Sequence, residues 1–308
     1  MMFWGDIILR YPKLIRELPR PVLALNWGYE ASHPFDREAR EFSRAGIPFY
    51  VCPGTSTWQT LVGRHDNAFQ NLAAAARAGR RHNAQGYLIT DWGDGGHPQP
   101  LAVSLIPYLV GASLSWCQAS FRPDRVGPVL SRDVFGDRTG RLAAAAMGLG
   151  LAHRKLRRTE PNATPLGTVI AAPPPERREL FCRNGLEHFA GIRKTNLLST
   201  LAELERQCSC LRRARPTARQ GAVLALELDL AARMAAQSCR FMLWQQAVSR
   251  KQHALARSMA RRNVAELRLL DRQFKKYWPL RNKGNTSHCS SFLQWRVADY
   301  FGRRRAAS

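Results

Sequence analysis

The sequence predicts an α/β fold with a parallel sheet, followed by a region that is built only of helices. Between Met1 and Pro100, four short apolar runs alternate with segments of helical pattern, and strands that alternate with helices pair in parallel through crossovers. Beyond Arg178 only helical periodicity recurs. Each apolar run also ends in an aromatic residue near a carboxylate or hydroxyl group, and binding groups collect on the loops that follow parallel strands.

The first region is expected to hold four buried strands with helices between them. Apolar runs bounded by glycine or proline predict strands at the start of the chain and at residues 22–25, 47–52 and 87–90. Helices are expected at residues 6–18, 33–43, 58–64, 66–78 and 101–116. Asp36 is expected to cap the second of these helices, and Gly79 is expected to end the fourth.

The second region is divided into a connector, residues 121–176, and a helical domain, residues 177–308. The connector contains an alanine-rich run at 141–147 and a proline-rich, irregular stretch from 159 to 176. Apolar residues at helical spacing predict four helices in the domain. Their apolar faces are expected to carry Leu198, Leu201, Leu204 and Cys208; Leu224, Leu228, Ala231, Ala235 and Cys239; Leu255, Met259, Leu267, Leu270 and Phe274; and Phe292, Trp295 and Tyr300.

Aromatic and acidic side chains at the strand ends form a candidate carbohydrate site. The C–H face of a sugar packs on an indole, and its hydroxyl groups need paired polar partners. The plainer alternative is that the acids cap helices and the aromatic rings fill the core. The candidate residues are Trp4, Asp6, Trp27, Tyr29, Glu30, Tyr50, Trp58, Trp92 and Asp94.

Four sequence motifs carry a resemblance to a known family. They are FWGDI at 3–7, WGYE at 27–30, FYVCPGTSTW at 49–58 and TDWGDGGH at 90–97. Together they resemble glycoside hydrolase family 20, the β-N-acetylhexosaminidases. The resemblance implies that residues 1–120 form the C-terminal half of a (β/α)8 TIM barrel, strands five to eight, so that the fold is a partial barrel followed by an all-α domain. The nine candidate residues would then follow these four strands and bind the sugar.

The resemblance also implies an activity, the removal of a terminal N-acetylhexosamine by a substrate-assisted retaining mechanism without metal or cofactor. Family members carry an adjacent Asp-Glu pair after strand four, and this sequence contains no such dipeptide. We therefore expect the catalytic pair to lie upstream of Met1 and no residue of this chain to be catalytic. Two departures affect the sugar site: Asp94 stands where many members have Glu, and Cys52 and Pro53 stand where an acid often follows the tyrosine at position 50.

Two other functions stay open. The chain could be a non-catalytic remnant that binds sugar weakly, or a basic helical protein that binds anionic polymers. The net charge is +24, from 47 basic and 23 acidic residues. Only seven of the basic residues are Lys, they are spread along the chain, and no nucleic-acid motif accompanies them, which argues against nucleic acid as a partner. Open barrel edges also predict self-association.

Without a recognisable signal peptide or membrane-spanning run, the sequence predicts a cytoplasmic protein by default, and a truncated N-terminus would leave the location open. The seven cysteines are odd in number and scattered, which predicts buried free thiols rather than disulfides. His97 near Asp91 and Asp94 is interpreted as part of a turn rather than a metal site. No signal peptide is recognised, and no apolar run is expected to be long enough to cross a membrane.

Overall fold

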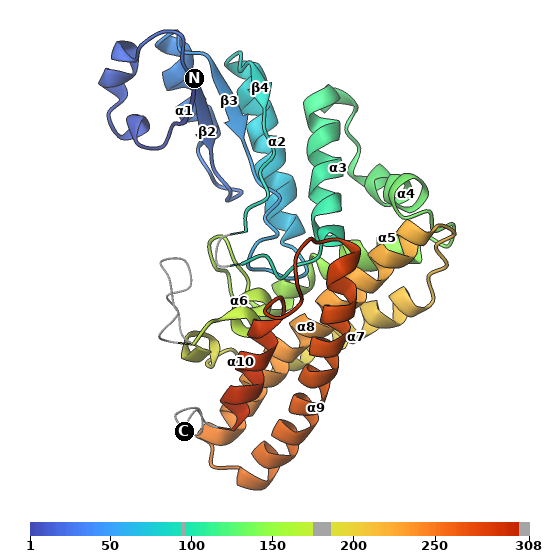
Figure 1. Ribbon diagram of the computed structural model, residues 1–308. Coiled ribbons are helices and arrows are strands. Elements are labelled where there is room, and N and C mark those ends of the chain that lie inside the picture. Colours follow the sequence, from blue (N-terminus) through green and yellow to red (C-terminus); the bar gives the residue numbers. More distant parts are fainter. Residues whose placement is uncertain (94–95, 175–185, 302–308) are drawn as a thin grey trace. The chain divides into compact units, whose positions relative to one another are not determined.

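The computed structural model describes residues 1–93, 96–174 and 186–301. Within them the chain forms two compact units, which are described separately below (Figure 1). The first unit comprises residues 1–56, 65–91 and 104–126. The second comprises residues 57–64 and 92–103 together with the chain from 127 onwards.

The first unit is built around a sheet of four parallel strands in the order β1-β2-β3-β4. The strands are β1 Met2–Trp4, β2 Leu23–Trp27, β3 Phe49–Cys52 and β4 Gly86–Tyr87. Strands that are consecutive in the sequence are neighbours in the sheet, and helices connect β2 to β3 and β3 to β4, as parallel pairing requires. The parallel α/β region is therefore confirmed. A barrel segment and an open sheet can both have this strand order, so the partial barrel stays a prediction.

One face of the sheet is covered by two helices, α1 Phe35–Arg44 and α2 His65–Arg81 (Figure 1). Alternate strand residues point to this face, because side chains along a strand alternate between its two sides. Phe3, Ala24 and Phe49 are register partners in one such row. They belong to a core that also includes buried residues of both helices, namely Phe35, Ala39, Phe42, Ala75 and Ala78.

The first unit also contains several further helical segments. The predicted helix at 6–18 is two short 3-10 helices, η1 Ile8–Arg10 and η2 Pro12–Glu17, because Pro12 begins a new turn. Helix α3 Leu101–Cys117 is followed by η3 Gln118–Ser120 and η4 Pro123–Arg125. The stretch 101–120 is, by length and composition alone, apolar enough to cross a membrane, contrary to the expectation from the sequence. Core helices pass the same test, so this finding assigns no membrane.

The second unit is a bundle in which the long helix α8 contacts α6, α7 and α9. Leu224, Leu228, Ala231, Ala235 and Cys239 of α8 are all buried, as their spacing predicts. The helical segments from residue 126 onwards are α4 Val126–Val129, η5 Leu130–Val134, α5 Arg141–Leu149, η6 Ala152–Leu156, α6 Pro165–Ala171, η9 Leu186–Phe189, α7 Lys194–Arg212, α8 Arg219–Ser249, α9 His253–Tyr277, η10 Trp278–Leu280 and α10 Ser291–Tyr300.

A helix interrupts the proline-rich stretch that was expected to be irregular. Helix α6 begins after Thr164, whose side chain accepts a hydrogen bond from the Gly167 amide and so caps the helix. Its C-terminal carbonyl groups are satisfied from outside the helix. The guanidinium of the fully buried Arg296 donates to the Val169 and Ala172 oxygens over 3.1 and 2.6 Å. Long-range contacts of this kind leave no local signature in the sequence.

Several local predictions in the first 80 residues are wrong. Residues 58–64 form buried turns rather than a helix, because Gln59 and Leu61 have left-handed φ angles of +54° and +62°. Asp36 lies inside the first turn of α1 and does not cap it. Its carboxylate instead accepts hydrogen bonds from Arg40, Arg81 and His82, and the His82 bond is the main reason that its pKa is lowered.

Two further predictions about helix limits and faces need correction. Helix α2 continues past Gly79 to Arg81, so Gly79 does not end the helix. A Cβ at Gly79 would press on Val51, so the glycine serves instead to let the helix approach the sheet. Leu198 and Leu255 are 46% and 45% exposed and do not belong to the buried faces. The buried face of α7 instead consists of Leu197, Thr200, Leu204, Gln207, Cys208 and Leu211.

Candidate functional site

The candidate site lies at the carboxyl ends of the strands of the first unit. Asp6 follows β1, and Tyr29 and Glu30 follow β2. Because all four strands are parallel, their carboxyl ends meet at one edge of the sheet, and side chains from separate strand ends can converge there. The strands β1, β2 and β3 end just before Gly5, Gly28 and Pro53, and glycine and proline are unfavourable inside a strand.

Asp6, Trp27 and Tyr29 form a contiguous cluster at this edge. The Trp27 indole Nε1 donates a hydrogen bond to the Asp6 Oδ1 over 3.1 Å. The rings of Trp27 and Tyr29 are stacked with their centroids 5.0 Å apart and an angle of 28° between their planes. All three side chains are partly exposed. The cluster thus offers two aromatic faces next to a carboxylate whose orientation is fixed.

Tyr50 lies on the face of the sheet that the two covering helices leave open. Trp4, Leu25, Tyr50 and Gly86 are register partners across the four strands and therefore share this face. The Tyr50 ring lies against Gly86, where a Cβ would come within 2.5 Å of the ring. Glycine at this position lets the tyrosine lie flat on β4. Trp4, at the other end of the row, is 40% exposed.

Two asparagines of α2 hold the loops that follow β2 and β3, and the sequence interpretation missed both. Asn71 is fully buried; its Nδ2 donates to the main-chain oxygens of Gly28 and Glu30, and its Oδ1 accepts from the Gly54 amide. Asn67, one turn earlier, bonds the main chain of Tyr29 and Ala31. The signal available in the sequence was this pair of asparagines, four positions apart in an alanine-rich helix.

The end of β4 is joined to the loop after β3. The Thr55 hydroxyl donates to the Asp91 Oδ1 over 2.7 Å, and the Thr55 amide donates to the Thr90 oxygen over 2.9 Å. Burial, and to a lesser extent the nearby charge of Asp91, raises the pKa of Tyr108. Asp91 thus holds the loop that follows β3 through its bond with Thr55.

The remaining candidate residues are placed as follows. Glu30 is half-buried and accepts a hydrogen bond from Asn71 through its main-chain oxygen. Trp58 and Trp92 belong to the second unit, where Trp58 is only 4% exposed. Asp94 lies outside the described residues. The structure therefore brings together Asp6, Trp27 and Tyr29, with Trp4 and Tyr50 on the same sheet.

Within the described residues, neither a metal centre nor the exposed basic stripe of α9 identifies a ligand. Among the described residues, no three His, Cys, Asp or Glu side chains are grouped so that they could hold a metal ion. Exposed arginines form one stripe along α9, because residues spaced by four, eleven and fifteen positions share a helix face. They are Arg257, Arg261, Arg268 and Arg272. Such a stripe attracts any anionic polymer through charge alone and identifies no partner.

Comparison with protein-family models and with curated proteins found no relative of this chain. No protein-family model matches the sequence, and no curated protein gives a significant match. The resemblance to glycoside hydrolase family 20 therefore depends on the four motifs and on what their residues can do in the structure.

Proposed function

We propose that the first unit carries the sugar-binding part of a β-N-acetylhexosaminidase site of the glycoside hydrolase family 20 type. The single observation that carries the proposal is the cluster of Asp6, Trp27 and Tyr29 at the carboxyl end of the parallel sheet. These residues come from two of the four motifs that resemble the family, and they meet although 21 positions separate Asp6 from Trp27.

The chemistry of the cluster supports a carbohydrate ligand. An indole stacked on a phenol presents a flat apolar surface on which the C–H face of a pyranose packs. The Asp6 carboxylate accepts only the indole bond at Oδ1 among the described residues, so its other oxygen can accept from a sugar hydroxyl. By the family resemblance, Tyr50 matches the acetamido-binding tyrosine, and its hydroxyl would supply a donor for the acetamido oxygen.

Binding without turnover is the expected behaviour of this chain alone. In the proposed mechanism the substrate's 2-acetamido group attacks the anomeric carbon while a general acid protonates the leaving oxygen. The family supplies that acid from its Asp-Glu pair, and the 308 residues contain no Asp-Glu dipeptide. The site residues described here would orient the sugar, and the chain would be a sugar-binding remnant if no acid were supplied from elsewhere.

The test is a calorimetric titration of the full chain with N-acetylglucosamine. We expect saturable binding with a dissociation constant in the millimolar range, about −4 kcal/mol, because only part of a pocket is present. Trp27→Ala should weaken binding at least tenfold, since it removes the aromatic face and the hydrogen bond to Asp6. The matched control is Trp116→Ala, which removes a 90% exposed indole of the same unit and should leave binding unchanged.

Two results would contradict the proposal. The sugar site would be refuted by an absence of saturable binding, or by equal effects of the Trp27 and Trp116 substitutions. The expected lack of turnover is checked separately with an aryl N-acetylglucosaminide. Appreciable release of the phenol by the purified chain would contradict the expected lack of turnover.

A further inference from the structure

A groove in the second unit is lined by one face of each of three helices. Its volume is about 720 Å³, within the range of small-molecule sites. Residues of α8 line it at spacings of three, four and seven positions, as one helix face does, and residues of α9 do the same. The lining residues are Leu204, Glu205, Cys208, Ser209 and Arg212 of α7, Arg233, Ala236, Gln237 and Arg240 of α8, and Met259, Arg262, Asn263 and Glu266 of α9.

Gln237 is a buried polar residue of this lining without a partner. It is 1% exposed, and neither its Nε2 nor its Oε1 has a hydrogen-bond partner among the residues that the structure describes. A buried amide without partners costs free energy, so native proteins rarely keep one unless something else satisfies it. Gln237 also lines the groove, so the groove is the side from which a partner for its amide would enter.

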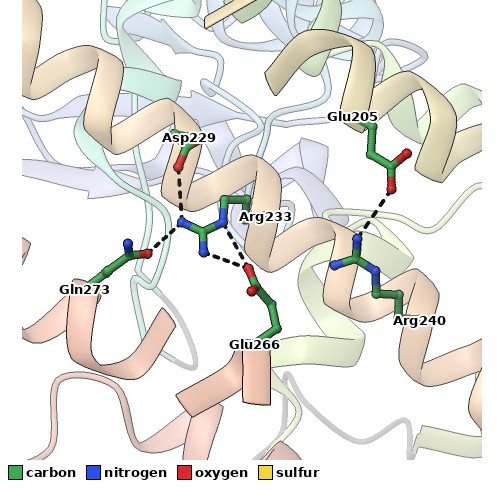
Figure 2. Close-up of polar contacts among 6 residues, drawn as sticks. All are labelled: Glu205, Asp229, Arg233, Arg240, Glu266 and Gln273. Atoms are coloured by element: carbon green, nitrogen blue, oxygen red, sulfur yellow. Dashed lines mark hydrogen bonds and ion pairs between the residues drawn. The ribbon is translucent and has the colours of Figure 1, made fainter. Parts of the chain in front are cut away.

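The two arginines of α8 in this lining are held by acidic residues to different degrees. Arg233 is enclosed: its guanidinium bonds Glu266 over 2.7 and 3.0 Å, Asp229 over 3.3 Å and Gln273 over 2.6 Å (Figure 2). Arg240 has a single, longer contact of 3.4 Å with Glu205 (Figure 2). The Glu205 side chain is 63% exposed, so solvent screens this pair. Arg233 therefore has a structural role, whereas the Arg240 guanidinium can exchange Glu205 for a ligand.

The other two arginines of the lining carry uncompensated charge. Arg212 donates to the Ser209 hydroxyl over 2.9 Å and forms no ion pair within the described part of the chain. Arg262 is exposed and has neither an ion pair nor a hydrogen bond to another described residue. With four arginines and two glutamates, the lining has a net charge of +2. A phosphomonoester carries about −1.5 to −2 at neutral pH and would match that charge.

We propose that this groove binds a small phosphomonoester with a polar body. Guanidinium groups bind phosphate oxygens through paired, charge-assisted hydrogen bonds, and Arg212, Arg240 and Arg262 supply them from all three helices. The Gln237 amide, which can donate and accept at once, bonds a hydroxyl or amide of the ligand body. Leu204, Ala236 and Met259 supply the apolar part of the wall. This site is independent of the sugar-binding cluster of the first unit.

The test is a calorimetric titration of the full chain with glucose 6-phosphate at 150 mM salt, with glucose and succinate in parallel. We expect saturable binding of glucose 6-phosphate and binding at least tenfold weaker for the other two. Arg262→Gln and Arg212→Gln should each weaken binding about tenfold, equivalent to about 1.4 kcal/mol for a lost charge-assisted bond. Arg261→Gln is the matched control: it removes an exposed arginine of α9 that does not line the groove, and binding should change less than twofold.

Gln237→Leu separates a binding role from a structural one. Leucine has a similar volume and needs no hydrogen bond, so the melting temperature should stay the same or rise while affinity for glucose 6-phosphate falls at least fivefold. The proposal is overturned by unsaturable binding, by equal effects of Arg261→Gln and Arg262→Gln, or by succinate binding as tightly as glucose 6-phosphate. It is also overturned if Gln237→Leu lowers the melting temperature and leaves affinity unchanged, because the amide then has a structural partner.

Discussion

Asp137 is the residue whose substitution tests the packing of the second unit most directly. It is fully buried, and its two carboxylate oxygens accept four hydrogen bonds. Oδ1 accepts from the Thr139 amide over 3.1 Å, the Thr139 hydroxyl over 2.7 Å and the Arg215 amide over 3.1 Å, and Oδ2 accepts from the Leu142 amide over 2.8 Å. The carboxylate thus joins the start of α5 to the chain segment between α7 and α8.

The expected cost of Asp137→Asn follows from these bonds. A hydrogen bond to a charged group contributes about 1.5–3 kcal/mol, and a buried donor left without a partner costs about 1–3 kcal/mol. The amide oxygen of asparagine can replace one carboxylate oxygen, but its NH2 group then faces the donors that the other oxygen served. We therefore expect the free energy of unfolding to fall by about 3 kcal/mol at pH 7.

The pH dependence of the stability loss follows from the pKa of Asp137. Burial by itself raises the pKa of Asp137, but the hydrogen bonds from Leu142, Thr139 and Arg215 together outweigh it and lower the pKa below the ordinary value of 3.8. A group with a lowered pKa in the folded state stabilises the fold above its unfolded pKa and loses that contribution as the pH falls through its folded pKa. The difference between the native protein and Asp137→Asn should therefore be full at pH 7 and shrink below pH 4.

Urea unfolding followed by helical circular dichroism measures this difference. The matched control is Asp133→Asn, which removes a carboxylate that is 48% exposed and pairs only with Arg132 among the described residues. Exposed pairs of this kind contribute about 0–1 kcal/mol, so the control midpoint should barely move. Equal midpoints for the two variants, or a penalty at Asp137 that is the same at pH 7 and pH 3, would refute the reasoning.

Two further predictions concern close packing and thiol reactivity. Gly167→Ala should destabilise the protein by about 3 kcal/mol in the same urea assay, because its Cβ would overlap the main-chain carbonyl of Gln59. The control Gly191→Ala has open space around the new Cβ and should change stability by less than about 0.5 kcal/mol. Similar effects of the two substitutions would contradict the close approach of Gly167 to Gln59. Iodoacetamide at pH 8 should label Cys117 well before Cys239 in the native protein, as peptide mapping would show. Hydrogen bonding at Ser120 lowers the pKa of the Cys117 thiol, and burial raises that of Cys239 to about 12; faster labelling of Cys239 would contradict its burial.

The expectation of free, buried thiols is confirmed in part. All six cysteines that the structure describes are free, but only Cys52, Cys208 and Cys239 are buried. Cys182 lies outside the described residues. Spacing and number alone could predict the absence of a disulfide framework, whereas burial depends on how the helices pack around each thiol.

The sequence by itself determined the strands and the place where polar residues gather. Strands β2 and β3 lie within a residue or two of their predicted positions, because apolar runs bounded by glycine and proline have few alternatives to a buried strand. It also indicated that Asp6, Trp27 and Tyr29 lie at strand ends. The prediction of a strand to residue 90 was too long, because β4 ends at Tyr87 and Thr90 pairs only through an isolated bridge to Gly54.

Only the tertiary structure decided which of these groups touch and what holds them. The bond from Trp27 to Asp6, the asparagines Asn67 and Asn71 under the loops, and the unpartnered Gln237 each depend on residues far apart in the chain. The local sequence pattern shows the hydrophobic periodicity over a few helical turns. It does not show which helix faces pack together or which buried donors find acceptors. Hydrogen-bond pairing and burial are properties of the packed chain, so the candidate sites were predictable as segments and became defined only after folding.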